Sequence, residues 1–306
     1  MAQQKIIVNP TSGRGAGELA IPAVEGLLRG LGLSFDLVRT ERPWHAAELA
    51  QQAALEGYEV VVALGGDGTA NEVLNGLMLA QKVGTGNRPA MGTVSVGRGN
   101  DFAYGVGVPK DMAAACQLLA EGHRHPIDVG RVVGGLFPQG RYFGNGVGIG
   151  FDAVVGFEAV KMTRLHGFLS YIVAALKTIF LYYRAPLVRV QYDGHEVTLL
   201  SLMVSIMNGR RLGGGFMMAP QGLIDDGLFD LTIASQVSKA RVFALIPRFM
   251  QGTQATHPAI STAKAARVTV TAVEGVLPAH ADGETLCTDA RQLSVELVPH
   301  ALDFIS

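Results

Sequence analysis

The stretch "EVVVALGGDGTANEVLNG", residues 59–76, decides the fold of the N-terminal part of the chain. Residues 60–64 form an apolar run typical of a buried strand, and residues 70–79 have helical periodicity. The loop between them contains Gly65, Gly66 and Gly68. A strand that leads through such a loop into a helix presents backbone N–H groups and a helix N-terminus, which together bind anions such as phosphate. An ordinary strand-to-helix turn without a ligand is the alternative.

Asp67 lies in the middle of this loop. An uncompensated carboxylate about 4 Å from a phosphate oxygen costs roughly 4 kcal/mol at the effective dielectric near a protein surface. A divalent cation between the two, as a nucleotide–Mg²⁺ complex supplies, removes this cost. Asp67 and Asn71 therefore favour a phosphate ligand that arrives with a metal. Thr69 is a candidate N-cap of the helix and a hydroxyl donor.

Short β-rich runs alternate with helical patterns through the first 130 residues. We predict strands at 6–8, 34–39, 60–64 and 93–96, and helices at 19–31, 46–56, 70–79 and 112–120. This alternation predicts a parallel sheet covered by helices, with ligands at the carboxyl ends of the strands. Two further glycine loops, 12–17 and 97–101, follow strands, and neither matches a dinucleotide or P-loop motif. Three loops at three strand ends predict one common crevice.

After Asp128 the pattern becomes mostly antiparallel β, with a hairpin signal at Asp193-Gly194. Helical patterns at 153–183, with a break near Gly167, and at 240–250 interrupt it. We predict a nucleotide-binding α/β domain at 1–127 and a β-rich substrate domain at 128–294, with the tail from about 295 to 306 free to return to the first.

Composition excludes several classes of protein. A net charge of -1 over 306 residues provides no field for nucleic acid. Cys116 and Cys287 are too few for a disulfide framework, so we expect reduced thiols and a cytoplasmic protein. The N-terminus lacks the apolar run of a signal peptide, and the most apolar stretch, 167–183, is too short for a membrane span and contains Lys177. The eight histidines show no metal-ligand spacing.

Six motifs together point to one family: "NPTSG" (9–13), "GGDGTANEVLNG" (65–76), "GRGNDFA" (97–103), "FGNGVGIGFDA" (143–153), "APQGLIDDGLFDL" (219–231) and "HADGE" (280–284). Their combination resembles the diacylglycerol kinase catalytic domain family, the bacterial lipid kinases related to sphingosine and ceramide kinases. The GGDG stretch alone is shared with NAD kinases and phosphofructokinases, whereas the later motifs are specific. The resemblance implies an N-terminal α/β nucleotide-binding domain, a C-terminal antiparallel β-sandwich-like domain and an active site in the cleft between them.

The resemblance also implies which residues contact the nucleotide. They are Asn9, Thr40, Gly65, Gly66, Asp67, Gly68, Thr69, Asn71, Gly97, Arg98, Asn100 and Asp101. Members of the family often have threonine where Arg98 stands. Arg98 therefore either replaces a hydroxyl contact by a charge on phosphate or points elsewhere.

"LIDDGL" (223–228) resembles the family's auxiliary magnesium site. The carboxylate of Asp226 and the main-chain carbonyls of Leu223 and Leu228 would form a hard-oxygen set suited to Mg²⁺. The alternative is a two-residue hairpin turn at Asp226-Gly227.

"HADGE" contains two carboxylates, Asp282 and Glu284, which share one face if the segment is extended. Phosphoryl transfer to an alcohol needs a carboxylate that accepts the hydroxyl proton. Glu284 resembles the family's general base, with Asp282 orienting it or helping to hold metal, and Asp67 completes the catalytic set. Solvated acids in a polar loop are the alternative.

These residues predict a lipid kinase that uses ATP and Mg²⁺ to phosphorylate a hydroxyl of diacylglycerol or a similar long-chain lipid. A kinase of a soluble substrate such as NAD, or a nucleotide-binding regulator without catalysis, remains as an alternative. We expect peripheral and reversible contact with a membrane, and a homodimer stays open. The helical stretch 153–183, with Lys161, Arg164, Lys177 and Arg184, either packs as core or faces lipid.

Overall fold

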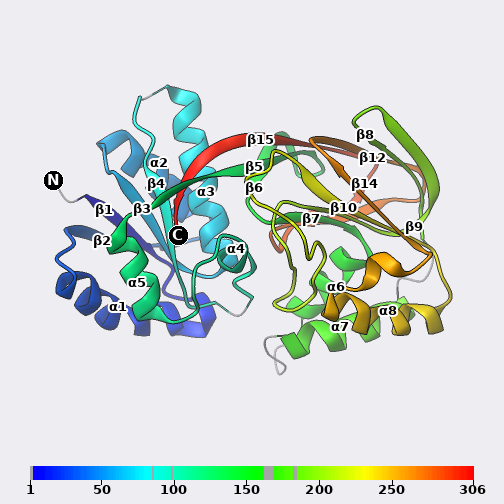
Figure 1. The fold of residues 1–306 in the computed structure, drawn as a ribbon, viewed down its shortest axis with the longest axis horizontal. Coiled ribbons are helices and arrows are strands. Elements are labelled where there is room, and N and C mark those ends of the chain that lie inside the picture. Colours follow the sequence, from blue (N-terminus) through cyan, green and yellow to red (C-terminus); the bar gives the residue numbers. More distant parts are fainter. Residues whose placement is uncertain (1–2, 85, 98, 162–167, 182–184) are drawn as a thin grey trace. The chain divides into compact units, whose positions relative to one another are not determined.

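The computed structural model describes residues 3–84, 86–97, 99–161, 168–181 and 185–306 (Figure 1). The chain forms two compact units. The first contains Met1–Val129 and Pro299–Ser306, and the second contains Gly130–Val298. The boundaries fall inside two strands, β5 (Arg124–Gly134) and β15 (Gln292–Ile305). The sequence placed them at 127 and about 295.

The first unit is a parallel sheet with strand order β15-β4-β3-β1-β2. Its strands are β1 (Gln4–Val8), β2 (Phe35–Arg39), β3 (Val60–Gly65), β4 (Ala90–Ser95) and the end of β15. Its helices are α1 (Ser12–Gly30), α2 (His45–Glu56), α3 (Asp67–Val83), α4 (Asp101–Gly105) and α5 (Met112–Glu121). Helices α2 and α3 pack together on one side of the strands, and α1 and α5 on the other (Figure 1).

The predicted alternation of strands and helices is confirmed. Strands β1, β3 and β4 are almost entirely buried, whereas every residue of the edge strand β2 is partly or fully exposed. All six residues of β3 are buried, which is what a central parallel strand requires. The returning tail is held by the buried carboxylate of Asp128, which accepts a hydrogen bond from the N–H of His300 at 2.8 Å. Phe304 packs edge to face on Phe102, with ring centroids 5.5 Å apart.

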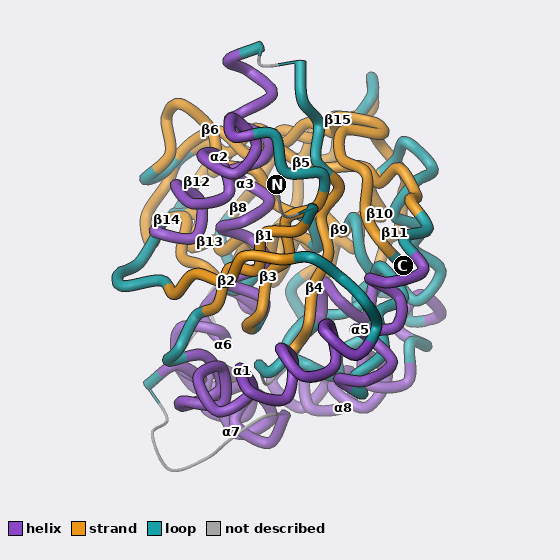
Figure 2. The backbone as a smooth tube through the Cα atoms, turned by 90° about the vertical axis from the view of Figure 1, so that its left-hand side faces the viewer, coloured by secondary structure: helices purple, strands orange, loops and turns teal. Residues whose placement is uncertain are grey.

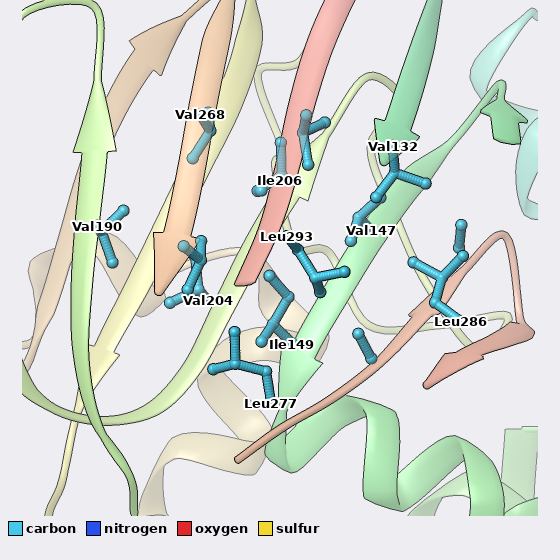
Figure 3. Packing of buried hydrophobic residues seen from close by; sticks show 14 of the residues in the cluster. Val132, Val147, Ile149, Val190, Val204, Ile206, Val268, Leu277, Leu286 and Leu293 are labelled. Carbon is cyan, nitrogen blue, oxygen red and sulfur yellow. The ribbon is translucent and has the colours of Figure 1, made fainter. Parts of the chain in front are cut away.

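The second unit is built from antiparallel strands in the order β14-β13-β7-β9-β8-β12-β15, and β10 pairs with both β9 and β11. Its strands are β6 (Phe137–Phe143), β7 (Gly146–Gly150), β8 (Leu187–Tyr192), β9 (His195–Met207), β10 (Phe229–Ser235), β11 (Ile260–Ala265), β12 (Arg267–Glu274), β13 (Leu277–Ala281) and β14 (Glu284–Ala290). Figure 3 shows its core, where Val147 and Ile149 of β7 meet Ile206 of β9 and Leu293 of β15. The predicted hairpin at Asp193-Gly194 is confirmed, since both residues have positive φ and join β8 to β9.

The helices of the second unit are α6 (Phe151–Val160), α7 (Phe168–Leu181) and α8 (Lys239–Gln251), and a short 3-10 turn, Gln254–Thr256, follows α8. The three helices lie close together, away from the core of Figure 3 (Figures 1 and 2). The predicted helix break near Gly167 lies outside the described residues, as do Arg164 and Arg184. Among the described helices, none is long and apolar enough to cross a membrane.

Candidate active site

The three glycine loops of the first unit lie against one another, as the sequence predicted. A Cβ on Gly97 would lie 2.6 Å from the Cα of Gly66, and a Cβ on Gly66 would lie 3.4 Å from the hydroxyl of Ser12. A Cβ on Gly13 would overlap the carbonyl oxygen of Val96. The loops after β1, β3 and β4 therefore approach one another through their backbones, and a side chain at Gly13 or Gly97 would clash with the neighbouring loop.

The loop after β1 has an unusual backbone. Gly13, Arg14 and Gly15 follow one another with φ values of 59°, 64° and 94°. Left-handed conformations cost non-glycine residues roughly 1–2 kcal/mol, so Arg14 is held there by its surroundings. Successive N–H groups in such a loop turn toward one side, which is a geometry that binds anions.

Asp67 has a structural partner that the sequence did not reveal. Its Oδ1 accepts a hydrogen bond from the N–H of Phe102 at 3.1 Å, at the start of α4. The carboxylate thus ties the loop after β3 to the loop after β4. One oxygen of Asp67 is committed to this bond, and Asp67 has further contacts among its neighbours.

Two other predicted residues lie beneath the loop. Thr69 and Asn71 are buried, with 3% and 2% exposure. The prediction that Thr69 caps the helix is wrong, because α3 begins at Asp67 and Gly66 occupies the N-cap position. The hydroxyl of Thr69 faces Gly65, where a Cβ would overlap it. The Thr69 side chain therefore packs beneath the loop and does not cap the helix.

The remaining predicted nucleotide contacts occupy the ends of neighbouring strands. The Thr40 N–H donates to the carbonyl of Val8 at 2.8 Å, so Thr40 lies beside Asn9 at the ends of β2 and β1. Asn9 Oδ1 accepts hydrogen bonds from the N–H and hydroxyl of Thr11. Asn100 Nδ2 donates to the Gly97 carbonyl at 3.0 Å, and Asp101 opens α4. Arg98 lies outside the described residues.

In the second unit, "HADGE" forms a tight hairpin between β13 and β14. Ala281 pairs with Glu284, and the two loop residues, Asp282 and Gly283, have φ values of 48° and 84°. Two positive φ values match the Asp-Gly turn that joins antiparallel strands most readily. The prediction that Asp282 and Glu284 share one extended face is wrong, because the turn reverses the chain between them.

The carboxylate of Asp282 is an acceptor for three successive backbone groups. Oδ2 accepts from the N–H of Gly144 at 2.8 Å, and Oδ1 accepts from Asn145 at 3.0 Å and Gly146 at 2.9 Å. Asp282 is 8% exposed. The side chain therefore fixes the hairpin to the loop before β7, which makes Asp282 a positioning residue for its neighbours.

Further hydrogen bonds extend this network to the end of β9. The carbonyl of Asn145 accepts from the N–H groups of Asn208 and Gly209, and Asn208 Nδ2 donates to the Gly144 carbonyl at 2.8 Å. The sequence analysis did not single out Asn208. In the sequence, Asn208 is part of an Asn-Gly pair at the end of a β-rich run, a pattern that is typical of an ordinary turn.

Glu284 differs from Asp282 in its exposure and in the contacts of its carboxylate. It is exposed, it is the first residue of β14, and its carboxylate has no hydrogen bond or ion pair within the part of the chain that the structure describes. An exposed carboxylate on a hairpin that is anchored by its neighbour is free to accept a proton from a substrate.

Asp152 and His280 are two further polar residues near Gly148 that the sequence analysis missed. A Cβ on Gly148 would overlap both Asp152 Oδ2 and His280 Nε2, so the two side chains fill the space above this glycine. Asp152 Oδ2 is enclosed and lacks a partner among the described residues, while Oδ1 accepts from the Ala153 N–H at 2.8 Å. Burial raises the pKa of Asp152 to about 7 and lowers the pKa of His280 to about 4.

Comparison with known proteins identifies the family. A family model described as diacylglycerol kinase catalytic domain matches residues 3–132, and one described as YegS C-terminal NAD kinase beta sandwich-like domain matches residues 145–306. A diacylglycerol kinase of Bacillus subtilis is 31% identical over 288 residues, which cover 93% of this chain and 90% of that protein. The chain belongs to the diacylglycerol kinase family. The family makes it a lipid kinase.

Other relatives of this kinase agree. A diacylglycerol kinase of Staphylococcus aureus is 29% identical over 281 residues, covering 92% of this chain and 85% of that protein. A crystal structure of a diacylglycerol kinase from Bacillus anthracis superimposes with a TM-score of 0.76 at 23% identity, covering 99% and 96% of the two chains. An NAD kinase from Archaeoglobus fulgidus in complex with ATP has a TM-score of 0.53 at 14% identity, covering 99% and 93%, and shares the fold.

The predicted magnesium loop of this kinase already contains a cation. Asp226 Oδ2 lies 2.6 Å from Lys264 Nζ, and Oδ1 accepts from the Leu228 N–H at 3.1 Å. Lys264 pairs directly across the sheet from Asp230, whose carboxylate lies 3.3 Å from the same ammonium. The hydrogen bond to Asp226 raises the pKa of Lys264. The Asp226 carboxylate is thus paired with a lysine in this structure, and a magnesium site at Leu223, Asp226 and Leu228 stays a prediction.

The alternative prediction for this loop, a two-residue hairpin, is wrong. Asp226-Gly227 is not a two-residue hairpin, because β9 ends at Met207 and the chain makes bends, not a strand, immediately before β10. The Asp226 side chain instead closes a local turn onto Leu228 and leads the chain into β10.

We expect Lys264→Ala to make the stability of this kinase depend on divalent cations. The change leaves Asp226 and Asp230 close together without a counter-charge, which costs about 1 kcal/mol for a partly exposed pair. Millimolar Mg²⁺ should raise the melting temperature of the variant and leave that of the wild type unchanged. Lys110→Ala, an exposed lysine, is the control. Equal responses of wild type and variant to Mg²⁺ would contradict this reading.

We expect Asp152→Asn to stabilise the kinase increasingly as the pH rises. Because the folded pKa of about 7 lies above the ordinary value of 3.8, the folded state holds a proton that the unfolded chain has lost. Wild-type stability therefore falls as the pH rises from about 4 to about 7. Asparagine removes this cost and keeps the Oδ1 bond to Ala153.

The difference in free energy of unfolding between Asp152→Asn and wild type should grow by on the order of 2 kcal/mol from about pH 5 to about pH 8. Urea unfolding followed by circular dichroism measures it. Asp289→Asn, an exposed acid on β14, should show a flat difference. A flat difference for Asp152→Asn as well would mean that its carboxyl group titrates normally.

Proposed function

We propose that this lipid kinase transfers the γ-phosphate of ATP to a hydroxyl of diacylglycerol or a similar long-chain lipid. The observation that carries the proposal is the exposed, unpaired Glu284 on a hairpin that Asp282 anchors through three N–H bonds. This arrangement gives a fixed carboxylate that is free to accept the proton of an attacking alcohol.

The first unit supports the nucleotide part of the proposal. The glycines at 13, 66 and 97 let the three loops pack against one another at the strand ends, where α3 begins. Backbone N–H groups and the helix dipole would bind the phosphates of ATP there. Gly65, Gly68, Asn9 and Thr40 belong to the same strand ends and would shape the pocket.

The proposal includes magnesium, bound together with the nucleotide and by Asp67. Within the described residues there is no cluster of three or more His, Cys, Asp or Glu side chains that could hold a metal. Kinases bind Mg²⁺ largely through substrate phosphates and one or two carboxylates, so Asp67 fits as the protein's contribution. When bound, the ion would neutralise charge on the phosphates. Asp67 itself positions the loops through its bond to Phe102.

The proton transfer assigned to the chain is simple. The oxygen of the lipid hydroxyl attacks the γ-phosphorus, and ADP leaves. Glu284 accepts the proton of this hydroxyl during the attack. Asp282 keeps the hairpin in place and needs no change of protonation. The lipid substrate requires contact with a membrane surface, which we propose is peripheral and reversible in a cytoplasmic protein.

Label transfer tests the proposal. The protein is incubated with γ-phosphate-labelled ATP, magnesium and a panel of micellar lipids, with NAD as a separate acceptor. We expect label in diacylglycerol or another long-chain lipid. Label in NAD alone would support a kinase of a soluble substrate, and no labelled product would support a nucleotide-binding regulator.

A further inference from the structure

Helix α8 has two apolar faces. Val242, Leu245 and Phe249 are buried and pack in a cluster with Leu202 and Met203 of β9. The opposite face is exposed and follows the spacing i, i+3, i+4, i+7, i+10, which marks one side of a helix. It consists of Ala240, Phe243, Ala244, Pro247 and Met250. Gln251, the last residue of the helix, also lies on this side and is polar but uncharged. Phe243 and Met250 are each 39% exposed.

Basic residues border this exposed face, which with them we call the α8 surface. With 3.6 residues per turn, Arg241 and Arg248 lie along one edge and Lys239 along the other. The helix contains no acidic residue, and the sequence has none from Leu231 to Val273. The α8 surface is therefore apolar at its centre and positive at its rim.

The neighbouring helix α7 also combines exposed apolar and basic residues. Ile246 of α8 packs against the buried cluster of Val155 and Ala159 of α6 and Ala174 and Ala175 of α7. Helices α7 and α8 lie side by side (Figures 1 and 2). On α7, Leu176 is 37% exposed and precedes Lys177. Glu158 of α6 forms ion pairs with Lys161 and Lys177 at 2.6 Å and 2.5 Å. These ion pairs leave the surroundings of α8 without an uncompensated negative charge from Glu158.

We propose that the α8 surface docks the protein on an anionic lipid membrane. Apolar side chains on an exposed helix face insert between head groups, and the basic rim attracts acidic lipids, so the two contributions act together. Charge also decides against a second copy of the chain as the occupant. A two-fold contact would bring the basic rims of two identical helices together, which is repulsive.

The inference rests on the proposed function in one respect: a kinase whose acceptor is a membrane lipid must reach that lipid at the bilayer. The α8 surface gives this contact a location. The α8 surface is a different segment from the stretch 153–183 that the sequence suggested, because its exposed apolar residues lie on α8.

Vesicle sedimentation without ATP or diacylglycerol tests the docking alone. The wild type should sediment with phosphatidylglycerol-containing vesicles and much less with phosphatidylcholine vesicles. Phe243→Ser with Met250→Ser should weaken binding about tenfold or more. Arg241→Gln with Arg248→Gln should weaken it by a similar factor, for acidic vesicles only. Leu136→Ser with Val273→Ser, which changes exposed apolar residues on strands and turns, should bind as the wild type does.

Activity separates docking from catalysis. With diacylglycerol in detergent micelles, the α8 variants should retain wild-type rates, and with diacylglycerol in acidic vesicles they should lose activity in proportion to binding. Undiminished vesicle binding by both α8 variants would overturn the inference, as would a wild-type dimer that the Phe243→Ser, Met250→Ser variant dissociates. Failure of the wild type to phosphorylate micellar lipid would refute the proposed function and leave the sedimentation result standing.

Discussion

Glu284→Gln is expected to lower turnover of the lipid by about 10²–10⁴-fold and to leave ATP binding unchanged. Glutamine has the same size as glutamate, but its amide cannot accept a proton from the attacking hydroxyl. Since the Glu284 side chain is exposed and makes no hydrogen bond or ion pair in the described structure, the change should not alter folding. A drop in turnover without a change in stability therefore reports on proton transfer.

The measurement combines steady-state rates on micellar diacylglycerol, calorimetric titration with ATP and thermal unfolding. Asp289→Asn removes an exposed carboxylate from the same strand, β14, and should keep wild-type turnover. Full activity in Glu284→Gln would remove it as the base. Equal losses in both variants would point to the charge of the strand as a whole.

Asp282→Ala is expected to destabilise the second unit by on the order of 3 kcal/mol or more and to abolish turnover. The change leaves three backbone N–H groups, those of Gly144, Asn145 and Gly146, without their acceptor, and each unsatisfied buried group costs about 1–3 kcal/mol. Alanine at a φ of 48° adds strain, because left-handed backbone disfavours a Cβ.

Two further substitutions separate these causes. Asp282→Gly accepts the positive φ but has no carboxylate, and Asp282→Asn tolerates the turn and keeps one acceptor oxygen. The order of stability should be wild type, then Asn, then Gly and Ala. Urea unfolding gives the free energies, and hydrogen exchange at the amides of residues 144–146 locates the effect. Wild-type protection of those amides in Asp282→Ala would contradict the anchoring role.

The sequence predicted the first unit well because local patterns specify it. In residues 59–76, an apolar run, three glycines and a periodic helix define strand, loop and helix without reference to the rest of the chain. The convergence of the loops followed from a general rule, since the carboxyl ends of parallel strands share one edge. The rule could not show that Asp67 bonds to Phe102, which lies 35 residues further along.

The site in the second unit was predicted only in part. Spacing suggested that Asp282 and Glu284 share a face, whereas positive φ at Asp282 and Gly283 reverses the chain. For the loop at Asp226, the sequence could not show that Lys264, which is 38 residues away, pairs with the carboxylate. For Asp282 and for Asp226, the sequence did not show which groups the carboxylate contacts.

By itself, the sequence determined the order and type of the elements, the change from a parallel to an antiparallel region and the family, because these follow from periodicity and from motifs of adjacent residues. Only the tertiary structure decided what each carboxylate does. It gave Asp282 the N–H groups of a loop 136 to 138 residues away, enclosed Asp152 beside His280 and left Glu284 exposed. The physical reason is that the role of a charge depends on its solvation and its partners, and both are set by chain segments that meet only when the protein folds.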